Sequence, residues 1–110
     1  MRPSLAWALL GVLFAPSLSA QPVRHAVQSG GHELTVWEKS AAAPSGTVVL
    51  LHGRTWSTLP DFDLQVPGED LSLMDGLVAR GFATYGLDAR GYGATPRDAD
   101  GWHTPDEAAE

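Results

Sequence analysis

The chain has 110 residues, a length that suits one domain at most. It contains no cysteine, which excludes disulfide frameworks, zinc–thiolate sites and cysteine nucleophiles. Its formal net charge of −6 argues against binding a nucleic-acid backbone, which requires a basic surface, so no nucleic-acid partner is expected.

The first twenty residues have the pattern of a secretory signal peptide. Arg2 supplies a short positive start, residues 5–15 are an apolar run, and small residues follow Pro16. The apolar run is shorter than the roughly 20 residues that span a bilayer. The pattern therefore favours cleavage near Ala20 over a membrane-anchoring helix. We expect a signal peptide over 1–20, a secreted or periplasmic mature chain, and no stable membrane span after signal removal.

An antiparallel hairpin is predicted at the start of the mature chain. A weak strand over 23–28 and an alternating strand over 33–39 flank Gly30-Gly31, which can adopt positive φ at little cost. The alternation predicts that the second strand is half-buried, with Leu34 and Val36 on one side.

A strand–helix–strand unit is predicted next. Residues 47–52 are a continuous apolar run, which is typical of a strand covered on both faces. A long loop is expected over 54–69. A helix then begins after Ser72, which with Asp75 suits a capping box, and Gly81 suits the C-terminal cap of that helix.

The second strand of this unit covers 82–88 and ends at Asp88. A glycine-rich loop follows, and another helix is predicted to begin after Thr104. In open α/β sheets, ligands bind beyond the carboxyl ends of the parallel strands. The loops that follow 47–52 and 82–88 are therefore the predicted site.

These two loops resemble the N-terminal part of the α/β-hydrolase family. In that family an apolar strand ends in His-Gly, and the next strand ends in Asp-x-Arg-Gly-x-Gly-x-Ser/Thr. About thirty-five residues separate the two motifs here, whose residues are His52, Gly53, Asp88, Arg90, Gly91, Gly93 and Thr95. The resemblance implies an α/β fold class, namely the N-terminal part of an α/β-hydrolase sheet with an antiparallel hairpin and then a parallel βαβ unit. Residues 21–110 would form an incomplete domain, about its N-terminal third.

The resemblance also implies roles for the first loop. The backbone N–H of Arg54 corresponds to a donor of the oxyanion hole, where a fixed N–H stabilises the negative oxygen of an acyl-transfer transition state. Gly53 lets the backbone approach the substrate, and His52 supports the loop from beneath. Trp56 is left with two readings, lining an acyl pocket or packing the loop.

The resemblance gives the second loop a structural role. Asp88 organises the loop that it opens, with Arg90 nearby, and Gly91 and Gly93 belong to the same motif. His103 is expected to be a surface residue and Ser57 a turn residue.

No Gly-x-Ser-x-Gly pentapeptide, the family's nucleophile motif, occurs in the sequence. None of the catalytic triad is therefore expected in this chain, and the nucleophile could be Ser or Asp. The resemblance implies part of a hydrolase acting on ester, amide or lipid substrates, inactive by itself, whose small-molecule, lipid or peptide substrate belongs to the full-length protein. The alternative is a small secreted binding or interaction module without enzymatic activity.

Two further readings of the sequence are weak. A dinucleotide site at Asp88 would need a Gly-x-Gly-x-x-Gly loop, which is absent, so no cofactor is expected. His25 and His32 face each other across the predicted hairpin, but two histidines without a third ligand make a poor metal site. Residues 61–63, Asp-Phe-Asp, are predicted to be a solvated acidic loop.

Overall fold

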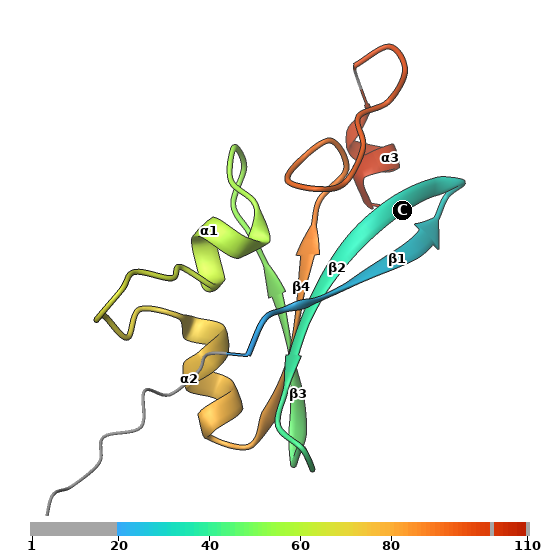
Figure 1. The fold of residues 1–110 in the computed structure, drawn as a ribbon. Helices are drawn as coiled ribbons and strands as arrows, with labels where there is room; N and C mark the ends of the chain where they lie inside the picture. The colour runs from blue at the N-terminus through green and yellow to red at the C-terminus, as the bar shows by residue number, and fades with distance from the viewer. Residues whose placement is uncertain (1–19, 102, 110) are drawn as a thin grey trace, which may run out of the picture.

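A computed structural model describes residues 20–101 and 103–109 as a mixed four-stranded sheet with three short helices (Figure 1). The signal-peptide prediction lies outside the described residues, apart from Ala20. The strands are β1 (Val23–Ser29), β2 (His32–Ser40), β3 (Gly46–Leu51) and β4 (Phe82–Asp88). The helices are α1 (Thr58–Phe62), α2 (Leu73–Ala79) and α3 (Pro105–Ala109). Among these residues, no helix has the length and apolar character needed to cross a bilayer.

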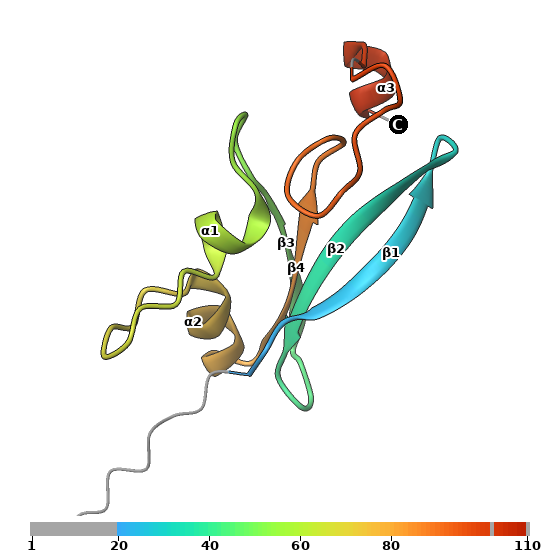
Figure 2. The same ribbon diagram turned by 45° about the horizontal axis from the view of Figure 1, so that its top comes forward.

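The sheet has the order β1-β2-β4-β3. β1 and β2 are antiparallel, β2 is antiparallel to β4, and β3 runs parallel to β4. The chain passes through α1 and α2 between the two parallel strands, and both helices lie on the same side of the sheet (Figures 1 and 2). The predicted hairpin and parallel βαβ unit are both confirmed.

Local signals in the hairpin and in α2 have the expected structural consequences. Gly30 and Gly31 have φ values of 54° and 77°, and Ser29 pairs with the residue directly after them. The Ser72 side chain accepts a hydrogen bond from the Asp75 amide at 3.0 Å. Gly81, with φ of 88°, ends the helix as predicted.

The long loop predicted over 54–69 contains a helix, so that prediction is wrong in part. α1 forms one turn, in which Pro60 is tolerated because the first-turn amides of a helix lack intrahelical acceptors. The Ser57 side chain makes no capping bond. The amide of Thr58 instead donates to the Asp88 carboxylate at 2.8 Å. A tertiary contact therefore stabilises this helix start.

β3 is not covered on both faces in the described structure, so the prediction of a doubly covered strand is wrong. Its burial alternates, and Val49 and Leu51 are 66% and 68% exposed. Val48 and Leu50 lie on the face that carries α1 and α2. Within the described residues β3 has one neighbour, β4, and forms an edge of the sheet.

The more deeply buried side of β2 is the one that carries Thr35 and Lys39, and not the one that carries Leu34 and Val36. Thr35 is fully buried and Lys39 is 4% exposed, whereas Leu34 and Val36 are only half-buried. The helices and the loop after β4 cover the polar side of the strand. Its polar groups tolerate this burial because they are hydrogen-bonded, as the Thr35 hydroxyl is to the Ala94 carbonyl oxygen at 3.1 Å.

Lys39 is the centre of a buried polar cluster between β2, the segment after α1 and the first turn of α2. Its Nζ donates to Asp63 at 2.6 Å and to Asp75 at 2.8 Å. The Ser72 hydroxyl also donates to Asp63 at 2.6 Å. Asp63 is therefore buried, and the prediction of a solvated acidic loop is wrong there, although Asp61 is exposed.

Candidate functional site

The loops that follow β3 and β4 meet at the carboxyl end of the parallel pair. His52 joins them, because its Nε2 accepts from the Ala89 amide at 2.9 Å. An acceptor Nε2 carries no hydrogen, so Nδ1 carries it and donates to the Gly53 carbonyl oxygen at 2.8 Å. The ring also contacts Tyr92, with centroids 5.6 Å apart. The neutral imidazole thus holds both loops in one arrangement.

Asp88, at the end of β4, fixes both sides of the site. Its Oδ1 accepts from the Thr58 amide at 2.8 Å, and its Oδ2 accepts from the Ala94 amide and the Trp37 indole N–H, each at 2.9 Å. The residue is 1% exposed. Burial alone would raise its pKa, but the hydrogen bonds from Ala94, Thr58 and Trp37 outweigh burial, so the pKa of Asp88 lies below its ordinary value.

The glycine and threonine of the second motif, Gly93 and Thr95, are explained by their contacts with Asp88. Gly93 has φ of 54°, and a Cβ there would overlap the Asp88 carboxylate. The Thr95 hydroxyl donates to the Asp88 carbonyl oxygen at 2.6 Å and accepts from the Thr35 amide at 2.9 Å. The loop therefore closes over Asp88 and is attached to β2.

Arg90 forms an ion pair with Asp98. Its guanidinium donates to both oxygens of Asp98, at 2.5 Å from Nη2 and at 3.0 and 3.1 Å from Nε. The hydrogen bond from Arg90 is the main cause that lowers the pKa of Asp98. A further bond of 3.3 Å to the Glu107 carbonyl oxygen connects this pair to α3. Arg90 thus fixes the far end of the loop.

Arg54 lies at a cleft of about 610 Å³ between the two loops. His52, Gly53, Ala89 and Tyr92 also line this cleft. Within residues 20–101 and 103–109, no group accepts a hydrogen bond from the Arg54 amide. Ala89, which follows Asp88, lines the same cleft as Arg54, and Arg54 lies outside the strands.

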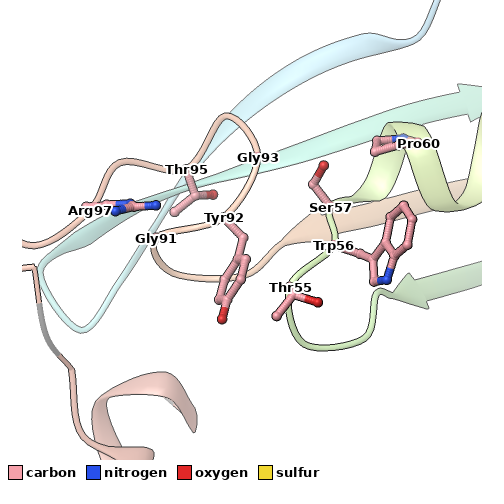
Figure 3. A pocket seen from close by; sticks show the side chains of 9 residues that line it. All are labelled: Thr55, Trp56, Ser57, Pro60, Gly91, Tyr92, Gly93, Thr95 and Arg97. Atoms are coloured by element: carbon pink, nitrogen blue, oxygen red, sulfur yellow. The ribbon is translucent and has the colours of Figure 1, made fainter.

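A smaller cleft of about 320 Å³ lies between the start of α1 and the loop 91–97 (Figure 3). Trp56 lines it and is 57% exposed, and its indole lies on the side of its loop that carries Pro60, pointing away from Tyr92. The neighbouring Thr55 has φ of 74°, which is uncommon for a β-branched residue. Backbone strain of this kind often occurs at functional sites.

The remaining histidines do not form a metal site in the described structure. His25 pairs with Val36 and His32 with Ser29, so the two do not face each other, and that expectation is wrong. His25 contacts Glu38 at 2.6 Å, and His32 contacts the Pro96 carbonyl oxygen at 2.8 Å. No group of three or more metal-ligating side chains occurs among the described residues.

Several residues of this site are not among those that the sequence motifs predict. Trp37 and Thr58 bind Asp88, and Tyr92 and Arg97 line the clefts. Thr58, Tyr92 and Arg97 lie in the two predicted loops, at positions that the motifs leave unspecified. Trp37 comes from β2 and reaches Asp88 only through the tertiary structure. His103 also lines the larger cleft and is half-buried.

Comparisons with known proteins identify the fold. No family model matches the sequence, and no curated protein matches it. Among solved structures, a thioesterase domain from the curacin biosynthetic pathway matches with a TM-score of 0.54 at 15% identity, covering 73% of this chain and 25% of that one. An epoxide hydrolase from Vigna radiata matches with a TM-score of 0.50 at 22% identity, covering 72% of this chain and 21% of that one.

The architecture is that of an open α/β sheet with two clefts at the carboxyl end of its parallel strands. More particularly, the chain has the α/β-hydrolase fold and corresponds to an N-terminal piece of that sheet. It spans about a quarter or less of the length of the two solved structures that it matches.

Proposed function

We propose that this chain is the N-terminal portion of a secreted or periplasmic hydrolase that acts on ester, amide or lipid substrates, and that its Arg54 amide is an oxyanion donor. The observation that carries the proposal is the Arg54 N–H without an internal acceptor, beside a cleft at the carboxyl end of β3. The fold of the matched structures supports a hydrolase origin.

The geometry suits a fixed donor. An acyl-transfer transition state places negative charge on the former carbonyl oxygen, and a donor held by rigid structure stabilises that charge without reorganising. His52 supplies the rigidity here, because its imidazole holds the Gly53 carbonyl on one side and the Ala89 amide on the other. Gly53 has open space where a Cβ would be, which leaves room for a substrate.

The chain by itself is proposed to be inactive, because the nucleophile motif is not in its sequence. We expect no turnover of p-nitrophenyl esters and no labelling by a fluorophosphonate probe. Stoichiometric labelling of any serine of this chain would contradict this part of the proposal.

The decisive experiment compares two substitutions at Arg54. The gene sequence beyond Glu110 is read first, and a Gly-x-Ser-x-Gly, or the same elbow with Asp, is expected about 25–45 residues further on, after one helix and one strand. In the protein with that elbow, Arg54→Pro removes the amide hydrogen, and we expect kcat/KM to fall about 10²–10³-fold.

Arg54→Ala is the matched control, because it removes the side chain and keeps the amide, and we expect little change in kcat/KM. Equal losses in both variants would contradict the assignment of the backbone donor. A stop directly after Glu110 in independent clones would overturn the hydrolase proposal and favour a small binding module.

A further inference from the structure

The smaller cleft, of about 320 Å³, has the features of a ligand site distinct from the one beside Arg54. Tyr92 lines both clefts, but the smaller one opens between the start of α1 and the loop 91–97 (Figure 3). Its volume is at the lower end of the range for small-molecule sites. Its lining residues include Thr55, Trp56, Ser57, Tyr92, Thr95 and Arg97.

One side of the cleft carries a cation without an acidic partner in the described structure. The sequence has 13 acidic and 7 basic residues, so a cation has ample opportunity to pair. Lys39 and Arg90 are both paired with carboxylates. Within residues 20–101 and 103–109, no carboxylate pairs with Arg97, which is exposed, and the same holds for Arg24, Arg54 and Arg80.

The Arg97 side chain packs against Gly91 and lines this cleft, and it also lines a neighbouring cleft beside Asp98. Gly91 has φ of 79°, and the position of a Cβ there is 3.6 Å from the Arg97 Cγ, so the aliphatic stem packs on the glycine. The loop around it is closed by a hydrogen bond of 3.2 Å from the Gly91 amide to the Pro96 carbonyl oxygen. The stem is thus supported, and the guanidinium is left at the cleft (Figure 3).

The opposite side supplies hydroxyl groups and an aromatic surface. The Ser57 side chain makes no cap bond to α1, and Thr55 is held in the left-handed region next to it. Trp56, which lies between them in the sequence, has an exposed indole and also lines the cleft. A group that combines an anion with an apolar body would find partners for both parts here.

Asp88 pre-organises both sides of this cleft. One carboxylate oxygen holds the Thr58 amide, directly after Ser57, and the other holds the Ala94 amide, directly before Thr95. Because the two sides are bonded to the same buried group, the distance between them is fixed before any ligand arrives. Pre-organisation of this kind reduces the entropic cost of binding.

We propose that this cleft binds the carboxylate of a small ligand, with the Arg97 guanidinium donating two hydrogen bonds and Trp56 contacting the apolar part. The planar guanidinium fork matches a planar carboxylate. A single cation matches one negative charge, which disfavours a dianionic phosphate in a chain with a net charge of −6. The site is a property of this chain and does not depend on the proposed hydrolase activity.

The proposal is tested by binding to the 110-residue chain at micromolar concentration, with ¹⁵N-labelled indole groups observed by NMR and the Trp56 signal assigned by Trp56→Phe. Benzoate is the probe, and benzamide is its neutral counterpart of the same shape. We expect benzoate to shift the Trp56 signal in a saturable way and benzamide to leave it unchanged.

Substitutions of Arg97 test whether its guanidinium is the group that binds the carboxylate. Arg97→Gln is expected to weaken benzoate binding about tenfold or more, and Arg97→Lys, which keeps the charge and loses the fork, to weaken it less. Arg80→Gln is the matched control, because Arg80 is exposed directly after α2 and its guanidinium donates to the Gly76 carbonyl oxygen, so its loss should leave binding unchanged.

Three results would overturn the proposal. They are equal shifts with benzoate and benzamide, an undiminished affinity in Arg97→Gln, and the lack of any shift at millimolar benzoate in a chain whose circular dichroism shows that it is folded. Tighter binding of inorganic phosphate than of benzoate would contradict the assignment to carboxylates. None of these readouts depends on hydrolysis, so failure here leaves the oxyanion proposal standing.

Discussion

Asp88 joins the segments that meet at the carboxyl end of the sheet. Its two oxygens accept three hydrogen bonds, from the amides of Thr58 and Ala94 and from the Trp37 indole. The side chain therefore links α1, the loop after β4 and strand β2 by hydrogen bonds. A residue with only one acceptor oxygen cannot serve all three.

Asp88→Asn tests how much these hydrogen bonds contribute to stability. The amide NH₂ replaces one acceptor and faces a buried N–H, so we expect a loss of about 1–3 kcal/mol in the free energy of unfolding for each donor left unpaired. Urea unfolding measures the loss, and hydrogen exchange at Thr58 and Ala94 shows where it arises. Asp61→Asn, on the exposed surface of α1, is the control. An equal effect of the two substitutions would contradict the role of Asp88.

The same carboxylate predicts a pH dependence. Because the pKa of Asp88 is lowered in the folded state, the unfolded chain takes up the proton first as pH falls below about 3.9. The stability contributed by Asp88 is therefore complete above that pH and is lost as pH falls through the folded-state pKa. We expect a flatter acid limb of stability against pH in Asp88→Asn than in the unmodified chain.

Gly93 is required for two reasons that can be separated. It has positive φ, and a side chain there would also overlap the Asp88 carboxylate. Gly68→Ala is the matched control, since Gly68 also has positive φ, 81°, but open space around it. We expect Gly68→Ala to cost about 1–2 kcal/mol of stability, and Gly93→Ala to cost clearly more. Equal costs in urea unfolding would show that the close approach to Asp88 is unimportant.

Among the elements, β2 and α2 are joined by charge. The buried hydrophobic residues of the described structure are few, namely Met74 and Ala83, so polar networks contribute much of the contact between sheet and helices. Lys39 bonds Asp63 and Asp75, which belong to different segments of the long connection between β3 and β4. This cluster positions α2 against the sheet.

Lys39→Met is expected to be strongly destabilising. It leaves the Asp63 carboxylate buried without its cation, and breaking a buried pair in this way typically costs about 3–5 kcal/mol. Lys39→Met combined with Asp63→Leu should recover part of the loss, because the orphaned charge is removed. Urea unfolding of the three proteins measures both effects. No recovery in the double variant would contradict a charge-based explanation.

The tendency of the whole chain to self-associate depends on the part of the sheet that the described helices do not cover. β3 is an edge strand without charged residues, and Val49 and Leu51 are largely exposed. An apolar edge strand of this kind is a site for intermolecular strand pairing. We expect the chain to self-associate as its concentration rises.

Val49→Lys tests this expectation. The lysine places a charge on the apolar face of β3, and we expect a higher monomer fraction by size-exclusion chromatography with light scattering. The substitution moves the net charge of −6 toward zero, so improved solubility could not come from greater net repulsion. Ala99→Lys makes the same charge change in an exposed loop and should give no improvement. Equal behaviour of both variants would exclude β3 as the contact.

The order of strands and helices could be predicted because its signals are local. The Gly30-Gly31 turn, the cap of α2 at Ser72 and its end at Gly81 depend only on backbone conformation and on near neighbours in the chain. The two loop motifs likewise identified the α/β-hydrolase sheet and the end of it where the clefts lie.

Burial and partnership were decided by the tertiary structure, since they depend on which segments pack together. Thr35 and Lys39 are buried because helices and a distant loop cover their side of β2, and β3 is half-exposed because that cover stops at one face. Arg90 bonds Asp98, and Asp88 reaches Thr58 and Trp37, across separations that no local pattern encodes. The sequence by itself determined the kind of sheet and the position of its loops, because backbone preferences act between near neighbours. Which side chains face a ligand was decided only when those loops were brought together and attached to one buried carboxylate.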